Sequence, residues 1–380
     1  MDFELDESQL VIAESVAAVL ADAGQADGAG AARGSDPEWA PAWRGLARAG
    51  LLSLVLPGWM DGDDLGVLDA AVLLTETGRR AASLPALATI MLGALPVVRW
   101  GSRELQERVL AGVGSGEVIL AAGVREQSAG WPAEPSTVAT LDGDTGTVTG
   151  TKVGVLFAGA ARWLLIPASL AGGGRAVVVI AASGDGVSMV ATPVSGGMPE
   201  YTVRLDAAPV VGVLGAGSPD GRLASIGDQR AAAVDDLNQL AAAGAAALGD
   251  GALAGALALT AGYVASREQF GRPLATFQAV AGEAADIYIA SRTLHLAALS
   301  ACWRLSAGLD SSQDTAVAAY WLAQEAPAAM RTCHQLHGGI GLDISYPLHR
   351  YSSMVADLAR FVGGAEYRLG LLADQVPVAG

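Results

Sequence analysis

Two short segments carry residue types that together could bind a phosphate-containing ligand. The first, 267–278, reads Arg-Glu-Gln-Phe-Gly-Arg-Pro-Leu-Ala-Thr-Phe-Gln, and the second, 335–341, reads Gln-Leu-His-Gly-Gly-Ile-Gly. Arg267 offers a planar fork of donors that suits two-point contact with a pyrophosphate. The paired glycines Gly338 and Gly339 allow close backbone approach and positive φ. Taken alone, the segments would favour simpler interpretations, a cation at a helix C-terminus and a helix terminator.

Long helices must position both segments, because each follows an extended Ala-rich helical pattern. From about residue 225 the chain shows four long helical stretches with short breaks, at 228–267, 277–307, 312–336 and 347–374. Their number and length predict an antiparallel four-helix bundle over residues 225–380.

Two different patterns precede the bundle. Residues 1–118 predict an N-terminal helical domain, in which Asp6 and Glu7 can cap the first helix and 23–37 form a loop. Residues 119–220 contain short β-rich runs separated by Gly, Pro and Asp about every ten residues, which is typical of a small barrel or sandwich. The sequence therefore predicts an α+β multidomain protein with a middle β-domain between two helical domains.

The composition excludes several classes of protein. The 380 residues carry a formal net charge of −16, which argues against nucleic-acid or anionic-membrane surfaces because both require basic patches. A site for an anionic ligand must then be locally positive. The most apolar stretch, 231–263, contains Asp235, Asp236 and Asp250 and indicates a buried helix more than a membrane span. The N-terminus has no leader pattern, so we expect a cytoplasmic protein.

The two cysteines, Cys302 and Cys333, form no CxxC pair and have no histidine at zinc-like spacing. We expect two buried apolar thiols and no metal site.

The two segments, at this separation, resemble the C-terminal bundle of the acyl-CoA dehydrogenase family, where both grip FAD. Residues 1–5 resemble the family's usual opening, and 43–52 resemble its second-helix segment. The order of domains also fits the family. The resemblance implies that fold, FAD as cofactor, and α,β-desaturation of an acyl-CoA thioester as the reaction, in fatty acid or steroid side-chain catabolism.

In the first segment, the resemblance implies a role for each matched residue. Arg267 and Gln269 would be polar contacts of the flavin, and Phe270 would pack near its adenine. Leu274 and Gln278 would line the same region. In the family this flavin belongs to a neighbouring subunit.

In the second segment, Gln335 would hydrogen-bond ribityl or phosphate oxygens, while Gly338 and Gly339 would let the backbone approach the cofactor. His337 could tune the flavin or cap the helix, and the second alternative is the more ordinary one.

The match fails where the family places its general base. Family members remove the substrate α-proton with a carboxylate while hydride leaves the β-carbon for flavin N5. One base position lies twelve residues after an Arg-Tyr pair, and here Arg350 and Tyr351 set that register and the position is Val362. The other lies twenty-six residues before Arg267 and is Ala241. Neither side chain can accept a proton, so the catalytic residue is unknown.

Other carboxylates could replace the missing base. Asp250 is a weak candidate because it lies nine residues after Ala241 and so faces another side of its helix. Glu126 could approach a flavin from the rim of the β-domain, and Glu366 reads as an exposed helix residue. In the segment 122–128, no Thr or Ser stands at the places where the family bonds the isoalloxazine, so the resemblance supports the adenosine side of the flavin site and not the isoalloxazine side.

Three hypotheses follow. The first is a base-lacking subunit of a heteromeric acyl-CoA dehydrogenase of the actinobacterial type, a hetero-oligomer and expected tetramer with a second, base-carrying dehydrogenase-like chain. The second is a self-sufficient flavoenzyme that uses a relocated base such as Asp250. The third is a non-catalytic binding or scaffold protein that has lost flavin.

Overall fold

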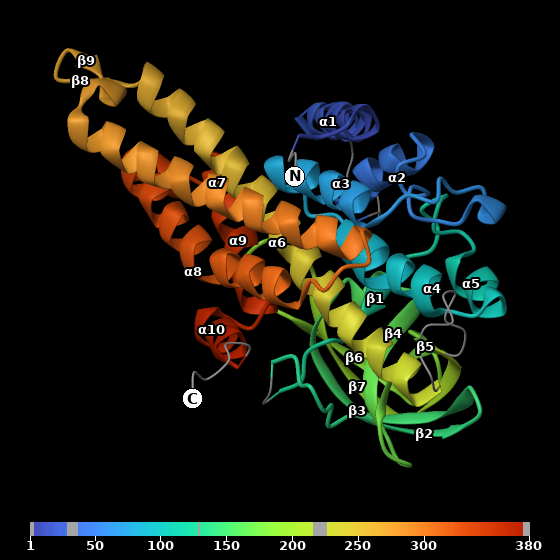
Figure 1. The fold of residues 1–380 in the computed structure, drawn as a ribbon. Helices are drawn as coiled ribbons and strands as arrows, with labels where there is room; N and C mark the ends of the chain where they lie inside the picture. Colours follow the sequence, from blue (N-terminus) through green and yellow to red (C-terminus); the bar gives the residue numbers. More distant parts are fainter. Residues whose placement is uncertain (1–3, 29–36, 128–129, 216–225, 375–380) are drawn as a thin grey trace.

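The computed structural model describes residues 4–28, 37–127, 130–215 and 226–374. It has a helical N-terminal part, a middle β-domain and a C-terminal helical bundle that extends well beyond the other two (Figure 1). The predicted fold class is therefore confirmed.

The N-terminal part is helical throughout its regular elements. They are α1 (Glu7–Gly28), α2 (Ala40–Arg48), η1 (Gly58–Met60), α3 (Val67–Arg79), η2 (Leu87–Ala94), α4 (Leu95–Trp100) and α5 (Arg103–Leu110). Asp6 caps α1, since its carboxylate accepts from the Gln9 amide at 2.9 Å while Gln9 Oε1 accepts from the Asp6 amide. The predicted loop at 23–37 is wrong over its first part, because α1 continues to Gly28, and residues 29–36 lie outside the described ranges.

A π-helical turn, η2, brings the N-terminal part against the bundle. It runs directly into α4, whose second residue, Pro96, has no N–H and would crowd the carbonyl four residues earlier in a regular α-helix. A wider π turn relieves that conflict. All residues of η2 are buried.

The β-domain is a closed barrel with two additional strands. Its strands are β1 (Leu120–Ala122), β2 (Val138–Asp142), β3 (Thr145–Leu156), β4 (Trp163–Leu170), β5 (Arg175–Ala181), β6 (Val187–Thr192) and β7 (Glu200–Val213). The pairing β4-β2-β3-β7-β5 returns to β4, while β1 pairs with β4 and β6 with β7. Most pairs are antiparallel, and only short parallel stretches join β4 to β1 and β2. An inner core of small and branched apolar side chains fills the ring.

The C-terminal bundle contains α6 (Ile226–Ser266), α7 (Gln278–Ser306), α8 (Ser312–His337), α9 (Leu348–Phe361) and α10 (Ala365–Ala373). The hairpin of β8 (Glu268–Gln269) and β9 (Arg272–Pro273) joins α6 to α7, followed by η4 (Leu274–Thr276). The fourth predicted helix is divided in two, because Gly363 and Gly364 both have positive φ.

The 41-residue helix α6 is the axis of the molecule. One stretch of it is long and apolar enough to cross a membrane, but 89% of that stretch is buried inside the protein. It is therefore a core helix. Where it crosses α3 the two backbones touch, since a Cβ on Gly251 would overlap the Thr75 carbonyl and one on Gly78 would overlap that of Leu248.

Candidate functional site

The first predicted segment forms an exposed hairpin at the far end of the bundle (Figure 1). Phe270 and Gly271 make its turn, with φ values of 55° and 78°. A bulky residue with positive φ is uncommon, and the Phe270 side chain is 92% exposed. Arg267 and Gln269 are exposed as well. The hairpin thus presents a guanidinium, an amide and an aromatic ring to solvent.

The remaining residues of this segment divide between surface and core. Gln278 is exposed at the first turn of α7. Leu274 is only half-buried, packs against the main core, and donates its amide to the Arg267 carbonyl at 2.8 Å. Leu274 therefore also anchors the hairpin.

The second predicted segment ends α8 and forms η5 (Gly338–Leu342). Gly338 has a φ of 61°, and a Cβ added at Gly338 or Gly339 would meet no atom within 4 Å. Both glycines are exposed. The loop therefore has an open face that a ligand could reach, as the glycine pattern predicts.

Contacts between the ends of α6, α7 and α8 bring the two segments together. Gln335 Nε2 donates to Glu283 Oε1 on α7 at 2.9 Å. The Tyr263 ring, one turn before Arg267, stacks on the His337 ring with centroids 4.6 Å apart. Both segments therefore lie at one end of the bundle, as their resemblance implies.

Exposed apolar side chains surround this end of the bundle. Besides Phe270, they include Ile340, Leu342 and Ile344, with exposed fractions of 41%, 81% and 80%. Leu342 and Ile344 are not among the residues expected from the sequence, although two large aliphatic side chains after a glycine loop were a signal for an exposed contact. Several large apolar side chains exposed at one end of a fold favour a contact site there.

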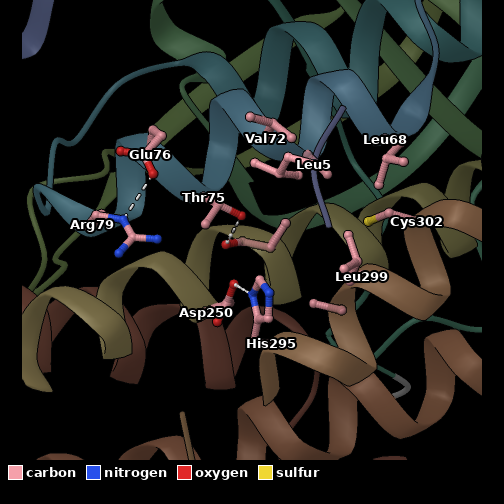
Figure 2. A pocket seen from close by; sticks show the side chains of 13 residues that line it. Leu5, Leu68, Val72, Thr75, Glu76, Arg79, Asp250, His295, Leu299 and Cys302 are labelled. Carbon is pink, nitrogen blue, oxygen red and sulfur yellow. Dashed lines mark hydrogen bonds and ion pairs between the residues drawn. The ribbon is translucent and has the colours of Figure 1, made fainter. Parts of the chain in front are cut away.

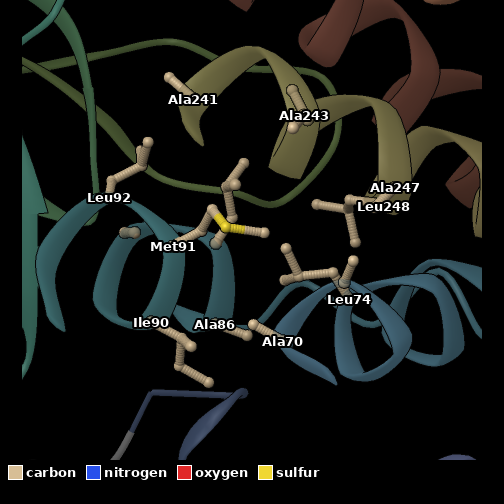
Figure 3. Packing of buried hydrophobic residues seen from close by; sticks show 14 of the residues in the cluster. Ala70, Leu74, Ala86, Ile90, Met91, Leu92, Ala241, Ala243, Ala247 and Leu248 are labelled. Atoms are coloured by element: carbon tan, nitrogen blue, oxygen red, sulfur yellow. The ribbon is translucent and has the colours of Figure 1, made fainter. Parts of the chain in front are cut away.

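The two base positions lie in a different environment. The Ala241 and Val362 side chains are both fully buried in the main core. One turn after Ala241, a Cβ on Gly244 would come within 2.7 Å of Met91 Cγ and 2.8 Å of Leu87 Cδ1 on η2. Figure 3 shows the helix carrying Ala241 packed face to face with the helices that carry Met91 and other core residues. Tight apolar packing therefore occupies this side of α6.

A cluster from the β-domain and α10 encloses the Val362 position. Trp131 Nε1 donates to the Phe361 carbonyl at 3.0 Å, and the Tyr367 hydroxyl donates to the Trp131 carbonyl at 2.7 Å. Arg368 Nε donates to the Val362 carbonyl, and its guanidinium lies 4.1 Å from the centre of the Trp131 ring. We call Trp131, Phe361, Tyr367 and Arg368 the aromatic clamp.

Arg368 is the unusual member of the aromatic clamp. It is 4% exposed, and burial lowers its pKa to about 10. In the described part of the chain its Nη2 has no hydrogen-bond partner. The chain therefore holds a buried cation against the backbone of Val362, where the family resemblance expects a carboxylate.

A second set of contacts fixes the end of α9 against the barrel. Arg360 donates to Glu200 through both terminal guanidinium nitrogens, Nη1 and Nη2, at 2.7 and 2.8 Å. Its Nη2 also donates to Asp357 at 3.0 Å. Asp357 in turn accepts from the Gly196 amide at 2.7 Å. These bonds and the aromatic clamp together leave the α9–α10 junction with little freedom to move.

Asp250 is 3% exposed and accepts from His295 Nδ1 at 2.9 Å. The pair lies beside a cavity of about 70 Å³ between α3, α6 and α7, with Thr75 and Arg79 nearby (Figure 2). Asp250 lies nine residues beyond Ala241, which is half a turn around the helix. It therefore points away from the face that carries Ala241, which disfavours it as a relocated base.

Glu126 is not available as a base. Lys152 Nζ donates to it at 2.6 Å, and Ser136 and Thr137 each donate a hydroxyl and a backbone amide. Burial would raise its pKa, but these hydrogen bonds outweigh burial and hold the pKa at about 2. Both members of the ion pair are buried. Glu366, in contrast, is exposed on α10 as expected.

A larger cleft, of about 420 Å³, lies where α1, α2, the α3–η2 loop, the β6–β7 loop and α9 meet. Its lining includes Arg80, Arg350, His349 and Glu38 together with the apolar Leu20 and Trp39. Two arginines against one carboxylate give this hollow a positive balance of charge despite the acidity of the protein. Its chemistry suits an anionic group attached to an apolar body.

The cysteines are free and buried, as predicted. Burial, with a contribution from Asp250, raises the pKa of Cys302 to about 12, so this thiol is unreactive at neutral pH. No group of three or more His, Cys, Asp or Glu residues suited to a metal ion occurs within the described ranges.

Known proteins share both helical parts of this chain. Residues 6–117 match the N-terminal domain of acyl-CoA dehydrogenases, and residues 234–376 match their C-terminal domain. The chain is 42% identical over 372 residues to the acyl-CoA dehydrogenase FadE28 of Mycobacterium tuberculosis, covering 98% of both chains. It is 31% identical to FadE27 of the same organism, covering 86% of this chain and 85% of the relative.

Two solved structures share the whole fold. A variant of the Tcur3481-Tcur3483 steroid ACAD has a TM-score of 0.86 and 31% identity, with 97% of each chain covered. The ChsE4-ChsE5 complex from Mycobacterium tuberculosis has a TM-score of 0.85 and 29% identity, with full coverage of both chains. Matching domains, identity and architecture together show that this chain belongs to the acyl-CoA dehydrogenase family.

Proposed function

We propose that this protein is the subunit of a heteromeric acyl-CoA dehydrogenase that contacts FAD without supplying the general base. Its family consists of oxidoreductases acting on CH–CH bonds with FAD as cofactor. The observation that supports a base-lacking role is the state of the two base positions. Val362 and Ala241 are both buried in apolar packing.

The exposed end of the bundle fits the adenosine side of FAD. Arg267 and Gln269 supply hydrogen-bond donors, Phe270 supplies an aromatic face, and Gly338 and Gly339 leave the backbone accessible. Leu274 and Gln278 belong to the same region, Leu274 as an anchor of the hairpin. Gln335 has its amide nitrogen on Glu283 and could offer its oxygen. When bound, FAD accepts the hydride that leaves the substrate β-carbon.

The residues of this chain would bind, orient and shield in that reaction. The guanidinium of Arg267 would hold phosphate oxygens with charge-assisted hydrogen bonds. The aromatic clamp and the packing between η2 and α6 keep water and substrate away from Val362 and Ala241. Abstraction of the α-proton at an acyl-CoA thioester would then depend on a carboxylate of the second chain.

Exposed side chains at the end of the bundle support a partner. Phe270, Leu342 and Ile344 are each at least 80% exposed, and covering them would remove apolar surface from water. Two of the solved relatives are themselves named as two-chain assemblies. By analogy we propose a hetero-oligomer with a second acyl-CoA dehydrogenase-like chain, expected to be a tetramer, in the cytoplasm.

One solved relative is named as a steroid ACAD, so we propose that the assembled enzyme desaturates an acyl-CoA thioester with a steroid or fatty acyl group. The chain itself would contribute cofactor contacts and shape to that site, and no proton acceptor.

The test is expression of the chain alone and with a base-carrying dehydrogenase-like chain, followed by flavin spectra and acyl-CoA-dependent dye reduction. We expect weak flavin retention and no turnover alone, and full flavin content and turnover with the partner. Full turnover by the isolated chain would establish the self-sufficient alternative. A lack of flavin under both conditions would support the scaffold alternative.

A further inference from the structure

Three rings link the two cofactor-contact segments. Tyr263 on α6 stacks on His337 at the end of α8, with centroids 4.6 Å apart and planes inclined by 19°. Tyr346, after η5, lies 5.2 Å from His337 and 6.4 Å from Tyr263 between ring centroids. The backbone carbonyl of Tyr263 also accepts from the Arg267 amide at 2.8 Å. The rings therefore connect the start of the hairpin to both ends of the glycine loop.

Hydrogen bonds determine the tautomer of His337. Its Nδ1 lies 2.8 Å from the Cys333 carbonyl oxygen, and its Nε2 lies 3.0 Å from the Tyr346 hydroxyl. A carbonyl can only accept, so Nδ1 carries the proton. In the neutral ring Nε2 is then an acceptor, and Tyr346 must donate to it.

The environment favours that neutral state. His337 is 3% exposed, and burial lowers its pKa although the bond to the Cys333 carbonyl acts in the opposite direction. The nearby His334 lowers it further. An acceptor at Nε2 is therefore available at neutral pH, and the bond from Tyr346 spans the loop that contains Gly338 and Gly339.

We propose that Tyr263, His337 and Tyr346 form a positioning unit that holds the Gly338–Leu342 loop in register with the Arg267 hairpin. This proposal rests on the proposed function, because it assigns the unit to the cofactor contacts of both segments. The three side chains act through the backbone they hold. The glycines need such support from outside, because they have no side chains with which to fix their own conformation.

The bond from Tyr346 to His337 can be removed from either side. Tyr346→Phe deletes the donor, and His337→Asn keeps a donor near Nδ1 for the Cys333 carbonyl but has no atom at Nε2. Tyr320→Phe is the matched control, because it deletes one tyrosine hydroxyl on the same helix as His337, about 25 Å away along α8 and outside the proposed unit. His337→Gln is the conservative variant, since its amide oxygen can reach toward Tyr346.

Two measurements are made on the full chain co-expressed with its partner. The first is the dissociation constant of FAD, and the second is hydrogen–deuterium exchange over residues 338–346 after FAD removal. We expect Tyr346→Phe and His337→Asn each to weaken FAD binding by about tenfold and to speed exchange in the loop. The double variant should be no worse than His337→Asn alone, because Tyr346→Phe then removes a bond that is already lost.

Tyr320→Phe should behave as wild type, and His337→Gln should recover most of the FAD affinity, which a merely structural role would not predict. Unchanged exchange and FAD affinity in Tyr346→Phe and His337→Asn, or strictly additive effects in the double variant, would overturn the proposal. If wild-type protein binds no FAD, the proposed function fails, and the exchange measurement still decides whether the unit holds the loop.

Discussion

Trp131 in the β-domain donates its indole N–H to the carbonyl of Phe361, the last residue of α9, at 3.0 Å. This bond joins the barrel directly to the residue before the family's base position. Because Arg368 holds the next carbonyl, both peptide groups at the junction are engaged. Val362, the position that the resemblance assigns to the base, is thus enclosed by protein and carries no carboxylate.

Restoring a carboxylate should therefore not restore catalysis. We expect Val362→Glu to give no acyl-CoA-dependent dye reduction by the isolated chain and no gain in the complex, because the side chain enters sealed core beside the Arg368 cation. Burying the new group should lower the free energy of unfolding by on the order of 3 kcal/mol. Val362→Gln controls for size. Turnover by the Val362→Glu chain alone would show that the position is open to substrate.

Arg267→Ala should weaken FAD retention in the assembled complex. A charge-assisted hydrogen bond contributes roughly 1.5–3 kcal/mol, which corresponds to about a 10- to 150-fold rise in the dissociation constant. Flavin titration at limiting FAD measures this dissociation constant. The value for Arg267→Lys should fall between those of wild type and Arg267→Ala, because lysine keeps the charge without the planar fork. Equal flavin occupancy in all three proteins would remove Arg267 from the site.

Asp250→Asn should leave the activity of the complex nearly intact while reducing stability. The Asp250 carboxylate is engaged by His295 on the side of α6 away from Ala241. Weakening a buried pair should lower the free energy of unfolding by about 1–3 kcal/mol, and a cycle with His295→Gln should show coupling. Chemical denaturation and turnover are measured on the same preparations. Loss of turnover in Asp250→Asn without loss of folding would make Asp250 the base after all.

Lys152→Met should destabilise the β-domain strongly. It leaves the buried Glu126 carboxylate without its cation, which typically costs about 3–5 kcal/mol. The double variant Lys152→Met/Glu126→Gln is the matched control and should be milder, because no charge is left buried. Urea unfolding followed by tryptophan fluorescence compares them. A single variant as stable as the double would mean that the pair adds nothing.

The same pair predicts the direction of acid sensitivity. The pKa of Glu126 in the folded protein is about 2, below its ordinary value of 4.5. The folded state therefore binds fewer protons than the unfolded state in this range, and stability is fully present above about pH 4.5 and falls toward pH 2. Glu126→Gln should flatten this part of the stability profile. An unchanged slope between pH 4.5 and 2 would assign acid sensitivity to other groups.

The order of helical and β domains could be predicted from the sequence, because helical and alternating periodicities show which faces of each element are buried. The family resemblance implied that the segments at Arg267 and Gln335 serve one cofactor, and the stacking of Tyr263 on His337 places the ends of α6 and α8 side by side. Tyr263 could have been found from its position one turn before Arg267. Tyr346 could not, because no local pattern relates it to the other rings.

The enclosure of Val362 by other side chains could not be predicted from the sequence, for a different reason. Trp131 and Arg368 lie 237 positions apart along the chain and meet only when the β-domain and α10 are in place. The absence of a carboxylate can be seen at a single position of the sequence. The packing around that position depends on side chains from several distant parts of the chain. The break at Gly363 could have been predicted, because two consecutive glycines interrupt the sequence there. The prediction of one long helix over 347–374 ignored them.

The backbones of α3 and α6 touch at Gly78 and Gly251, so the position and tilt of α6 are fixed at this crossing. From Gly251 to Arg267 the helix extends roughly 24 Å, at about 1.5 Å per residue. A side chain forced into the crossing that tilted α6 by about 5° would move the Arg267 end by about 2 Å, several times the tolerance of a hydrogen bond. Two glycines more than 20 Å from Arg267 thus determine where this end of the bundle lies.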